Sequence, residues 1–266
     1  MAKTHDQKNI HFGTYFGVTA MSAASAMGAA LMTSWFMLYL TDYAGIGNWG
    51  AKLGTVLLFV ARLIDAVNDP VQGWIMDNAK VRRIGKYKPF IIVSIILTTV
   101  GISCLFFLPT SLSSNPVFIC AWVIFFYLMY DFGESFYAPN LIYRTLTEDE
   151  VERSKLMIWP RLLSLFIGMA CVSLIAIVNI VNDQVGNMHT AFGLTVLSAM
   201  AGAGVVALVG MIFVKERYTV QTEKSEKIRL TDIFCSVKMM RFALKSLPIC
   251  FQVSSGHFFL PLACMT

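Results

Sequence analysis

The chain has 266 residues, of which 56% are hydrophobic and only 14% are charged. A typical soluble domain carries about 25% charged residues, so this composition excludes an ordinary soluble domain as well as disordered and collagen-like chains. The six cysteines lie far apart and form no CxxC pair, which argues against a disulfide framework and a zinc site. The sequence therefore predicts an all-α integral membrane protein.

Six apolar runs are each long enough to cross a bilayer, which takes about 20 helical residues. They cover residues 12–40, 53–76, 89–108, 117–136, 156–181 and 191–214. The connections near residues 112–115 and 182–187 are short, so successive helices are expected to be antiparallel neighbours. We therefore expect a six-transmembrane-helix bundle over residues 1–214.

The net charge of +5 is interpreted as a signal of topology and not of nucleic-acid binding. Lys and Arg gather in the N-terminus, in the second and fourth connections and after residue 214, whereas the alternate connections hold only Lys52. Since Lys and Arg are retained on the cytoplasmic side, both ends of the bundle are expected to face the cytoplasm. We expect a multi-pass protein of the cytoplasmic (inner) membrane, with the lipid bilayer as a partner.

Two segments follow the predicted bundle. Residues 215–245 are polar and charged, which is typical of a cytoplasmic linker near anionic headgroups. Residues 246–266 are apolar but contain Pro248 and Pro261, so they are a poor seventh span. We expect the last segment to be a truncated or aberrant tail.

Charged residues inside the apolar runs are the functional candidates, because an ionised side chain at mid-membrane costs about 2.5–3.5 kcal/mol on insertion scales. In the second run, Arg62, Asp65 and Asp69 occupy one helical face, with Asn68 beside them. Carboxylate and amide oxygens suit a small hard cation, and Arg62 would balance the charge of an empty site. The alternative is structural, with Arg62 paired to Asp65 and Asp69 paired to Arg161.

The fourth and fifth runs contribute three further candidates. Asp131 and Glu134 lie one turn apart and are predicted to bind the substrate or the coupling ion. The alternative is that they pair with Arg144 or Arg153 at the inner surface. The planar guanidinium of Arg161 suits sugar hydroxyls or a carboxylate, and the alternative is an anchor at the inner edge.

The second connection contains Gly73, Asp77, Arg82, Gly85 and Lys86 in that order. Gly73 is expected to let helices approach closely, Asp77 to cap a neighbouring helix or pair with an Arg, and Gly85 to permit a tight turn. This order resembles the loop between helices 2 and 3 of the major facilitator superfamily, whose fold it implies. The resemblance implies a cytoplasmic gate loop, and the alternative is a loop that only fixes topology.

Residues 61–74 (ARLIDAVNDPVQGW) and 85–89 (GKYKP) narrow the resemblance. They resemble the glycoside-pentoside-hexuronide:cation symporter family, the group of the melibiose permease. Residues 39–42 (YLTD) and 159–161 (WPR) are similar to that family too. The similarity runs from about residue 11 to residue 217.

This resemblance implies roles for four residues. Asp65, Asn68 and Asp69 would belong to a site for Na⁺, H⁺ or Li⁺, and Arg161 would contact the sugar. No Asp or Glu lies between residues 22 and 42, where the melibiose permease has an acidic galactoside ligand. A sugar, glycoside or uronide is therefore expected in place of an α-galactoside, with no cofactor besides the coupling cation.

Members of this family have two related six-helix halves with the substrate between them. The resemblance thus implies cation-coupled symport by an N-terminal half, with the missing C-terminal half as its partner. One alternative is a non-transporting membrane fragment or scaffold. Another is a Mg²⁺-dependent lipid transferase using Asp65, Asp69 and Asp77, which is disfavoured because the basic segment after Asp77 contains no acid until Asp131. We expect a transporter and not an enzyme.

Overall fold

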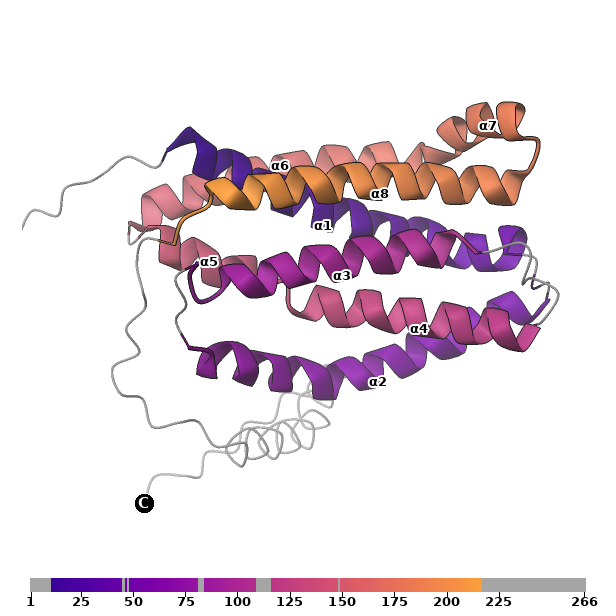
Figure 1. The fold of residues 1–266 in the computed structure, drawn as a ribbon, viewed down its shortest axis with the longest axis horizontal. Coiled ribbons are helices and arrows are strands. Elements are labelled where there is room, and N and C mark those ends of the chain that lie inside the picture. The colour runs from indigo at the N-terminus through magenta and orange to yellow at the C-terminus, as the bar shows by residue number, and fades with distance from the viewer. Residues whose placement is uncertain are drawn as a thin grey trace, which may run out of the picture. The chain divides into compact units, whose positions relative to one another are not determined.

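The computed structural model describes residues 11–44, 46, 48–80, 84–108, 116–147 and 149–216. Its helices are α1 (Phe12–Leu38), the π-helical turn η1 (Tyr39–Tyr43), α2 (Asn48–Asn78), α3 (Lys88–Phe106), α4 (Pro116–Ser135), α5 (Pro139–Leu146), α6 (Glu150–Val172), α7 (Leu174–Val185) and α8 (Met188–Phe213) (Figure 1). The predicted linker beyond residue 216 and the predicted tail lie outside the described residues.

The prediction of an all-α membrane bundle is confirmed. Five segments of the described chain are long and apolar enough to cross a membrane: α1 with η1, α3, α4 with α5, α6, and α8. α2 is also long, with 31 residues, but Arg62, Asp65 and Asp69 interrupt its apolar sequence. α1 packs against α6 and α8, α3 packs between α4 and α8, and α2 lies against α4 (Figure 1).

The short helix α5 was not expected from the sequence. Pro139 lies at its first turn, where the absence of a backbone N–H costs nothing. One side of α5 is buried through Ile142, Tyr143 and Leu146. Eight residues are too few to cross a membrane, so a helix of this length gives no apolar-span signal in the sequence.

The fifth predicted span is divided into α6 and α7 at Ser173. The indole Nε1 of Trp35 donates to the carbonyl oxygen of Cys171 at 2.7 Å, and a side chain inserted at a helix carbonyl is a recognised cause of kinks. α6 also begins earlier than expected, because the Asp149 carboxylate accepts the N–H of Val151 at 2.9 Å as an N-cap.

The core is held by close helix contacts and by aromatic rings. A Cβ at Gly17 of α1 would overlap the carbonyl oxygen of Gly210 in α8, so only glycine permits this approach. The rings of Tyr39, Phe106 and Phe192 lie 5.0–5.6 Å apart between centroids and join η1, α3 and α8. These aromatic contacts fill the end of the bundle away from the α2–α3 loop.

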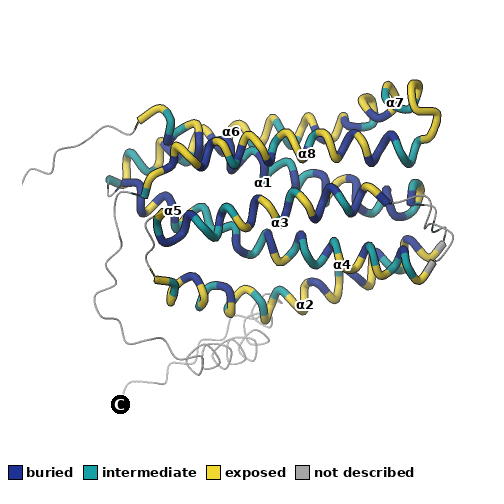
Figure 2. The backbone as a smooth tube through the Cα atoms, in the orientation of Figure 1, coloured by how far each residue is buried: buried dark blue, intermediate teal, exposed yellow. Residues whose placement is uncertain are grey.

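The outer faces of the bundle are apolar. Much of the backbone of α6 belongs to exposed residues (Figure 2). Its exposed large apolar side chains include Trp159, Leu165, Phe166 and Met169. α2 exposes a second apolar face that includes Phe59. In water such surfaces are costly, whereas in a bilayer they face acyl chains, as a membrane protein requires.

The two ends of the bundle differ in charge. The start of α1, the end of α2, α5 and the end of α8 all lie at one end (Figure 1). The described cations at this end are Lys80, Lys86, Lys88, Arg144, Arg153, Lys155 and Lys215. At the opposite end, Lys52 is the only Lys or Arg among the described residues.

Candidate functional site

Charged side chains of α2 and α4 line a cavity of about 480 Å³, here called the acidic cavity. Its lining comprises Met32, Thr33, Met37, Leu58, Arg62, Asp65, Asp69, Tyr127, Tyr130, Asp131, Glu134 and Ser135. The helical period already placed Asp65 and Asp69 on one face. The packing of α2 against α4 adds Asp131 and Glu134, a grouping that the sequence alone did not reveal.

Arg62 forms an ion pair within this cavity. Its Nη1 lies 3.5 Å from Oδ2 of Asp65, and the two side chains are 81% and 19% exposed, respectively. The predicted alternative that pairs Asp69 with Arg161 is not observed, because the described residues form no ion pair between these two side chains, which line different cavities. Four carboxylates thus face one guanidinium. Ionised together, they leave an excess of negative charge that a small cation or protons would neutralise.

The carboxylates of the acidic cavity do not form a compact metal centre. Among the described residues, no three acidic, histidine or cysteine side chains converge closely enough to hold a metal ion. Asp77, which the lipid-transferase alternative required, lies outside the cavity lining.

Asn68 lies one step around α2 from the acidic cavity. Its Nδ2 donates to Oγ of Ser135 at 3.4 Å, and Ser135 lines the cavity. The hydroxyl of Ser135 donates in turn to the carbonyl oxygen of Asp131 at 3.2 Å. Ser135 therefore connects Asn68 of α2 to the backbone of α4 at Asp131. Ser135 was not predicted from the sequence, although its spacing of four residues from Asp131 is a helical signal.

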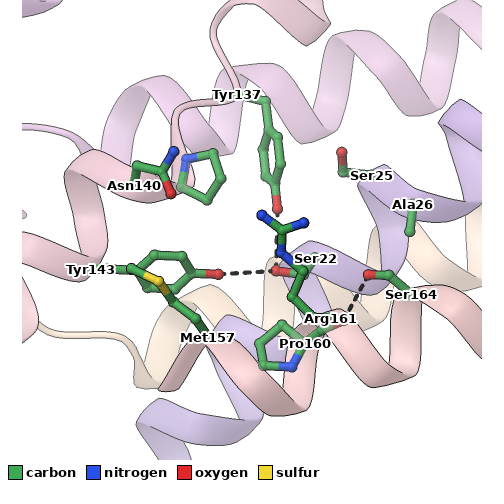
Figure 3. A pocket seen from close by; sticks show the side chains of 11 residues that line it. Ser22, Ser25, Ala26, Tyr137, Asn140, Tyr143, Met157, Pro160, Arg161 and Ser164 are labelled. Carbon is green, nitrogen blue, oxygen red and sulfur yellow. Dashed lines mark hydrogen bonds between the residues drawn. The ribbon is translucent and has the colours of Figure 1, made fainter. Parts of the chain in front are cut away.

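Arg161 lines a second cavity of about 290 Å³ between α1, α5 and α6, here called the arginine cavity (Figure 3). The other lining residues are Ser22, Ser25, Ala26, Tyr137, Pro139, Asn140, Tyr143, Met157, Pro160 and Ser164. None of these carries a formal charge. The cavity thus combines one cation with several hydroxyl groups and an amide.

The hydroxyl groups of the arginine cavity form a network around Ser22. The phenol of Tyr137 donates to Oγ of Ser22 at 3.2 Å, and the Tyr143 phenol lies 3.4 Å from the same oxygen (Figure 3). The guanidinium of Arg161 makes no ion pair with any described residue. Its N–H donors are therefore available to a ligand.

The loop between α2 and α3 only partly matches its prediction. Gly85 has φ of +116°, which confirms the tight turn, and Nζ of Lys86 donates to the carbonyl oxygen of Asp77 at 2.9 Å. The expected close approach at Gly73 is wrong within the described chain, where no atom of another helix lies within 4 Å of a Cβ placed there. Arg82 lies outside the described residues.

The helix cap expected from Asp77 is supplied by Glu216. The Glu216 carboxylate accepts the backbone N–H groups of Lys86, Tyr87 and Lys88 at 2.8, 2.9 and 2.7 Å. Burial raises the pKa of the Tyr87 hydroxyl, and the nearby charges of Asp77 and Glu216 act in the same direction. The sequence shows that Glu216 comes directly after the last apolar run. No local pattern indicates that this carboxylate accepts hydrogen bonds from the start of α3.

The chain is similar in sequence to a family of transport proteins and to several curated relatives. Residues 15–254 match the family described as "MFS/sugar transport protein". The "Putative glycoside/cation symporter YagG" of Escherichia coli (strain K12) is 30% identical over 237 residues, covering 81% of this chain and 48% of the relative. The "Uncharacterized symporter YnaJ" of Bacillus subtilis (strain 168) is 26% identical over 223 residues, covering 80% of this chain and 45% of the relative.

A shorter match is closer in sequence. The "Glucuronide carrier protein homolog" of Escherichia coli (strain K12) is 40% identical over 80 residues, covering 30% of this chain and 16% of the relative. The chain spans about half the length of the two curated relatives that it matches along most of its sequence. Together the matches relate the chain to sugar transport proteins and to proteins named as symporters.

Proposed function

Because the chain belongs to the MFS/sugar transport protein family, we propose that it forms the N-terminal half of a symporter that couples Na⁺ or H⁺ to an anionic sugar. The observation that carries this proposal is the presence of two cavities of opposite charge in one bundle. One holds four carboxylates against one guanidinium, and the other holds an unpaired guanidinium among hydroxyl groups.

The acidic cavity is proposed as the cation site, with Asp65 and Asp69 as the main ligands. A cation or proton there neutralises repulsion between carboxylates on α2 and α4 and so draws the two helices together. The hydrogen bond from Asn68 to Ser135 supports the same contact. Arg62 balances part of the charge when no cation is bound. Na⁺, Li⁺ and H⁺ all fit this role.

The arginine cavity is proposed as the sugar site. The guanidinium of Arg161 can pair in a fork with a carboxylate, and the surrounding hydroxyl groups can bind the hydroxyl groups of the ring. Arg161 is exposed at the cavity and has no counter-ion among the described residues, so its positive charge favours an anionic ligand over a neutral one. We therefore propose a uronide, meaning a sugar that carries a carboxylate, as the substrate class. The partial match to a protein named as a glucuronide carrier homologue supports this class.

The membrane placement is proposed from the distribution of charge. The end that bears the α2–α3 loop, rich in Lys and Arg, is assigned to the cytoplasmic face of the inner membrane, with the N-terminus on that face. Since transport requires one bundle to rock against another, we propose that a second bundle completes the pathway. The exposed apolar faces of α2 and α6 are available to it.

Binding to the purified chain in lipid nanodiscs tests the sugar assignment. Methyl β-D-glucuronide and methyl β-D-glucoside differ only in the carboxylate, so calorimetric titration compares charge at equal size. A charge-assisted fork contributes about 1.5–3 kcal/mol, so the glucuronide is expected to bind at least about tenfold more tightly. Arg161→Gln should remove this preference. Equal affinities for the two glycosides would overturn the assignment.

The cation assignment has its own test in the same nanodiscs. Asp69→Asn is expected to weaken binding of radioactive Na⁺, or uptake of protons if H⁺ is the coupling ion, by about tenfold or more. Asp42→Asn is the matched control, because Asp42 is exposed in η1 and lines neither cavity. Unchanged cation binding in the Asp69 variant would show that the acidic cavity is not the cation site.

A further inference from the structure

The two cavities share one wall. Ser25 of α1 lines the arginine cavity, and Glu134 of α4 lines the acidic cavity. The hydroxyl Oγ of Ser25 donates to Oε1 of Glu134 at 3.1 Å. Among the described residues, this is the one side-chain hydrogen bond that joins the lining of one cavity to the lining of the other.

The neighbouring contacts hold this wall in place. One turn earlier in α1, Ser22 accepts the hydroxyl of Tyr137, and the backbone N–H of Tyr137 is bonded to the carbonyl oxygen of Glu134 at 2.9 Å. Two adjacent residue pairs therefore link α1 to the end of α4. Both serines can rotate their hydroxyl groups without any movement of the backbone.

A serine hydroxyl has a single proton, so it can donate in only one direction at a time. While Glu134 is ionised and binds no cation, its carboxylate is the stronger acceptor and accepts the hydrogen bond from the hydroxyl of Ser25. When Glu134 binds a proton or a cation, its oxygens accept less strongly. The hydroxyl of Ser25 is then free to turn toward the arginine cavity, where it becomes a donor beside Arg161.

We propose that the Ser25–Glu134 hydrogen bond couples the two sites, so that occupation of the acidic cavity adds Ser25 as a donor to an anionic sugar in the arginine cavity. This inference rests on the proposed function and assigns Ser25 as a positioning residue that acts between the two ligands. By linkage, the sugar strengthens cation binding by the same factor as the cation strengthens sugar binding.

The proposal predicts opposite effects for two substitutions. Glu134→Gln removes the negative charge that attracts the hydrogen bond of the Ser25 hydroxyl, so the sugar should bind tightly whether or not a cation is present. Ser25→Ala removes the donor, so the sugar should bind weakly in both conditions. A contact that only holds α1 against α4 would weaken binding in both variants.

The experiment measures the affinity of the chain in nanodiscs for methyl β-D-glucuronide in Na⁺ and in choline buffer, at acidic and at alkaline pH. The wild type should bind about tenfold more tightly with its coupling cation than without it, a typical allosteric factor. In Ser25→Ala this factor should fall to about one, and Ser25→Thr should restore it. Ser154→Ala is the control and should keep the wild-type factor, because Ser154 lines neither cavity and donates to the carbonyl oxygen of Glu150 at 2.8 Å.

The outcomes separate this inference from the proposed function. Loss of the charge preference or of cation binding, as tested above, would remove the proposed function itself. If the wild type binds both ligands and Ser25→Ala keeps the wild-type factor, the proposed function stands and the coupling role of Ser25 is overturned. A wild type that binds both ligands independently would overturn it equally.

Discussion

Removal of the Glu216 carboxylate tests how the cytoplasmic end of the bundle is held. In Glu216→Ala, the backbone N–H groups of Lys86, Tyr87 and Lys88 lose their shared acceptor at the start of α3. Each hydrogen bond to a charged acceptor contributes about 1.5–3 kcal/mol, and water replaces part of this at a half-buried position. The local loss is therefore expected to be about 3 kcal/mol for the three bonds together.

Hydrogen exchange followed by mass spectrometry reads this loss directly. A local opening free energy lowered by about 3 kcal/mol corresponds to roughly 100-fold faster exchange in a peptide that covers residues 85–90. Glu150→Ala is the control, because Glu150 lies in the first turn of α6 but its side chain makes no hydrogen bond to any residue that the structure describes. If Glu216→Ala exchanges like the wild type, the carboxylate does not hold the start of α3.

Three further predictions use the same chain in nanodiscs. Gly17→Val should lower the temperature of thermal unfolding strongly, since its Cβ would overlap the backbone of α8, whereas Gly73→Ala should leave it nearly unchanged; similar losses in both variants would contradict the packing described for α1 and α8. Asp65→Asn should weaken cation binding about tenfold and leave glucuronide binding in choline buffer intact, and a loss of both would contradict the separation of the two cavities. Tyr137→Phe removes the hydrogen bond to Ser22 and should weaken binding of methyl β-D-glucuronide by about three- to tenfold. Titration of the neutral glucoside should show a loss that is no larger, and a larger loss for the glucoside would contradict this.

The sequence was informative where the physical signal is local. Apolar runs located the long helices, and the helical period placed Asp65 and Asp69 on one face. The positive φ of Gly85 followed from its place in a basic turn before a proline. Each of these features depends on a few neighbouring residues, which is why the sequence alone could predict it.

The remaining features depend on residues that are distant in the sequence. Glu216 caps a helix that starts about 130 residues earlier, and Ser25 meets Glu134 across 109 residues. The break at Ser173 follows a contact with Trp35 of α1 and leaves no proline or glycine at the break. Only the packing of the helices decides these contacts. The roles of the cation and sugar residues remain predictions.

The difference between Gly73 and Gly17 shows why a motif does not fix a packing role. Both glycines lie in long helices, yet only Gly17 meets a neighbouring backbone in the described chain. The close approach depends on which helix lies opposite, and α8 lies opposite Gly17. A glycine in a recognised pattern therefore indicates a possible contact, and the tertiary arrangement determines whether the contact forms.

Symport itself is tested most directly by uptake of radioactive methyl β-D-glucuronide into proteoliposomes that contain the chain completed by a matching C-terminal half. We expect an inward gradient of Na⁺ or H⁺ to drive the sugar above equilibrium, and Asp69→Asn and Arg161→Gln each to abolish this accumulation. Cation-driven accumulation that survives Asp69→Asn, or wild-type uptake that does not depend on the gradient, would contradict the proposed symport.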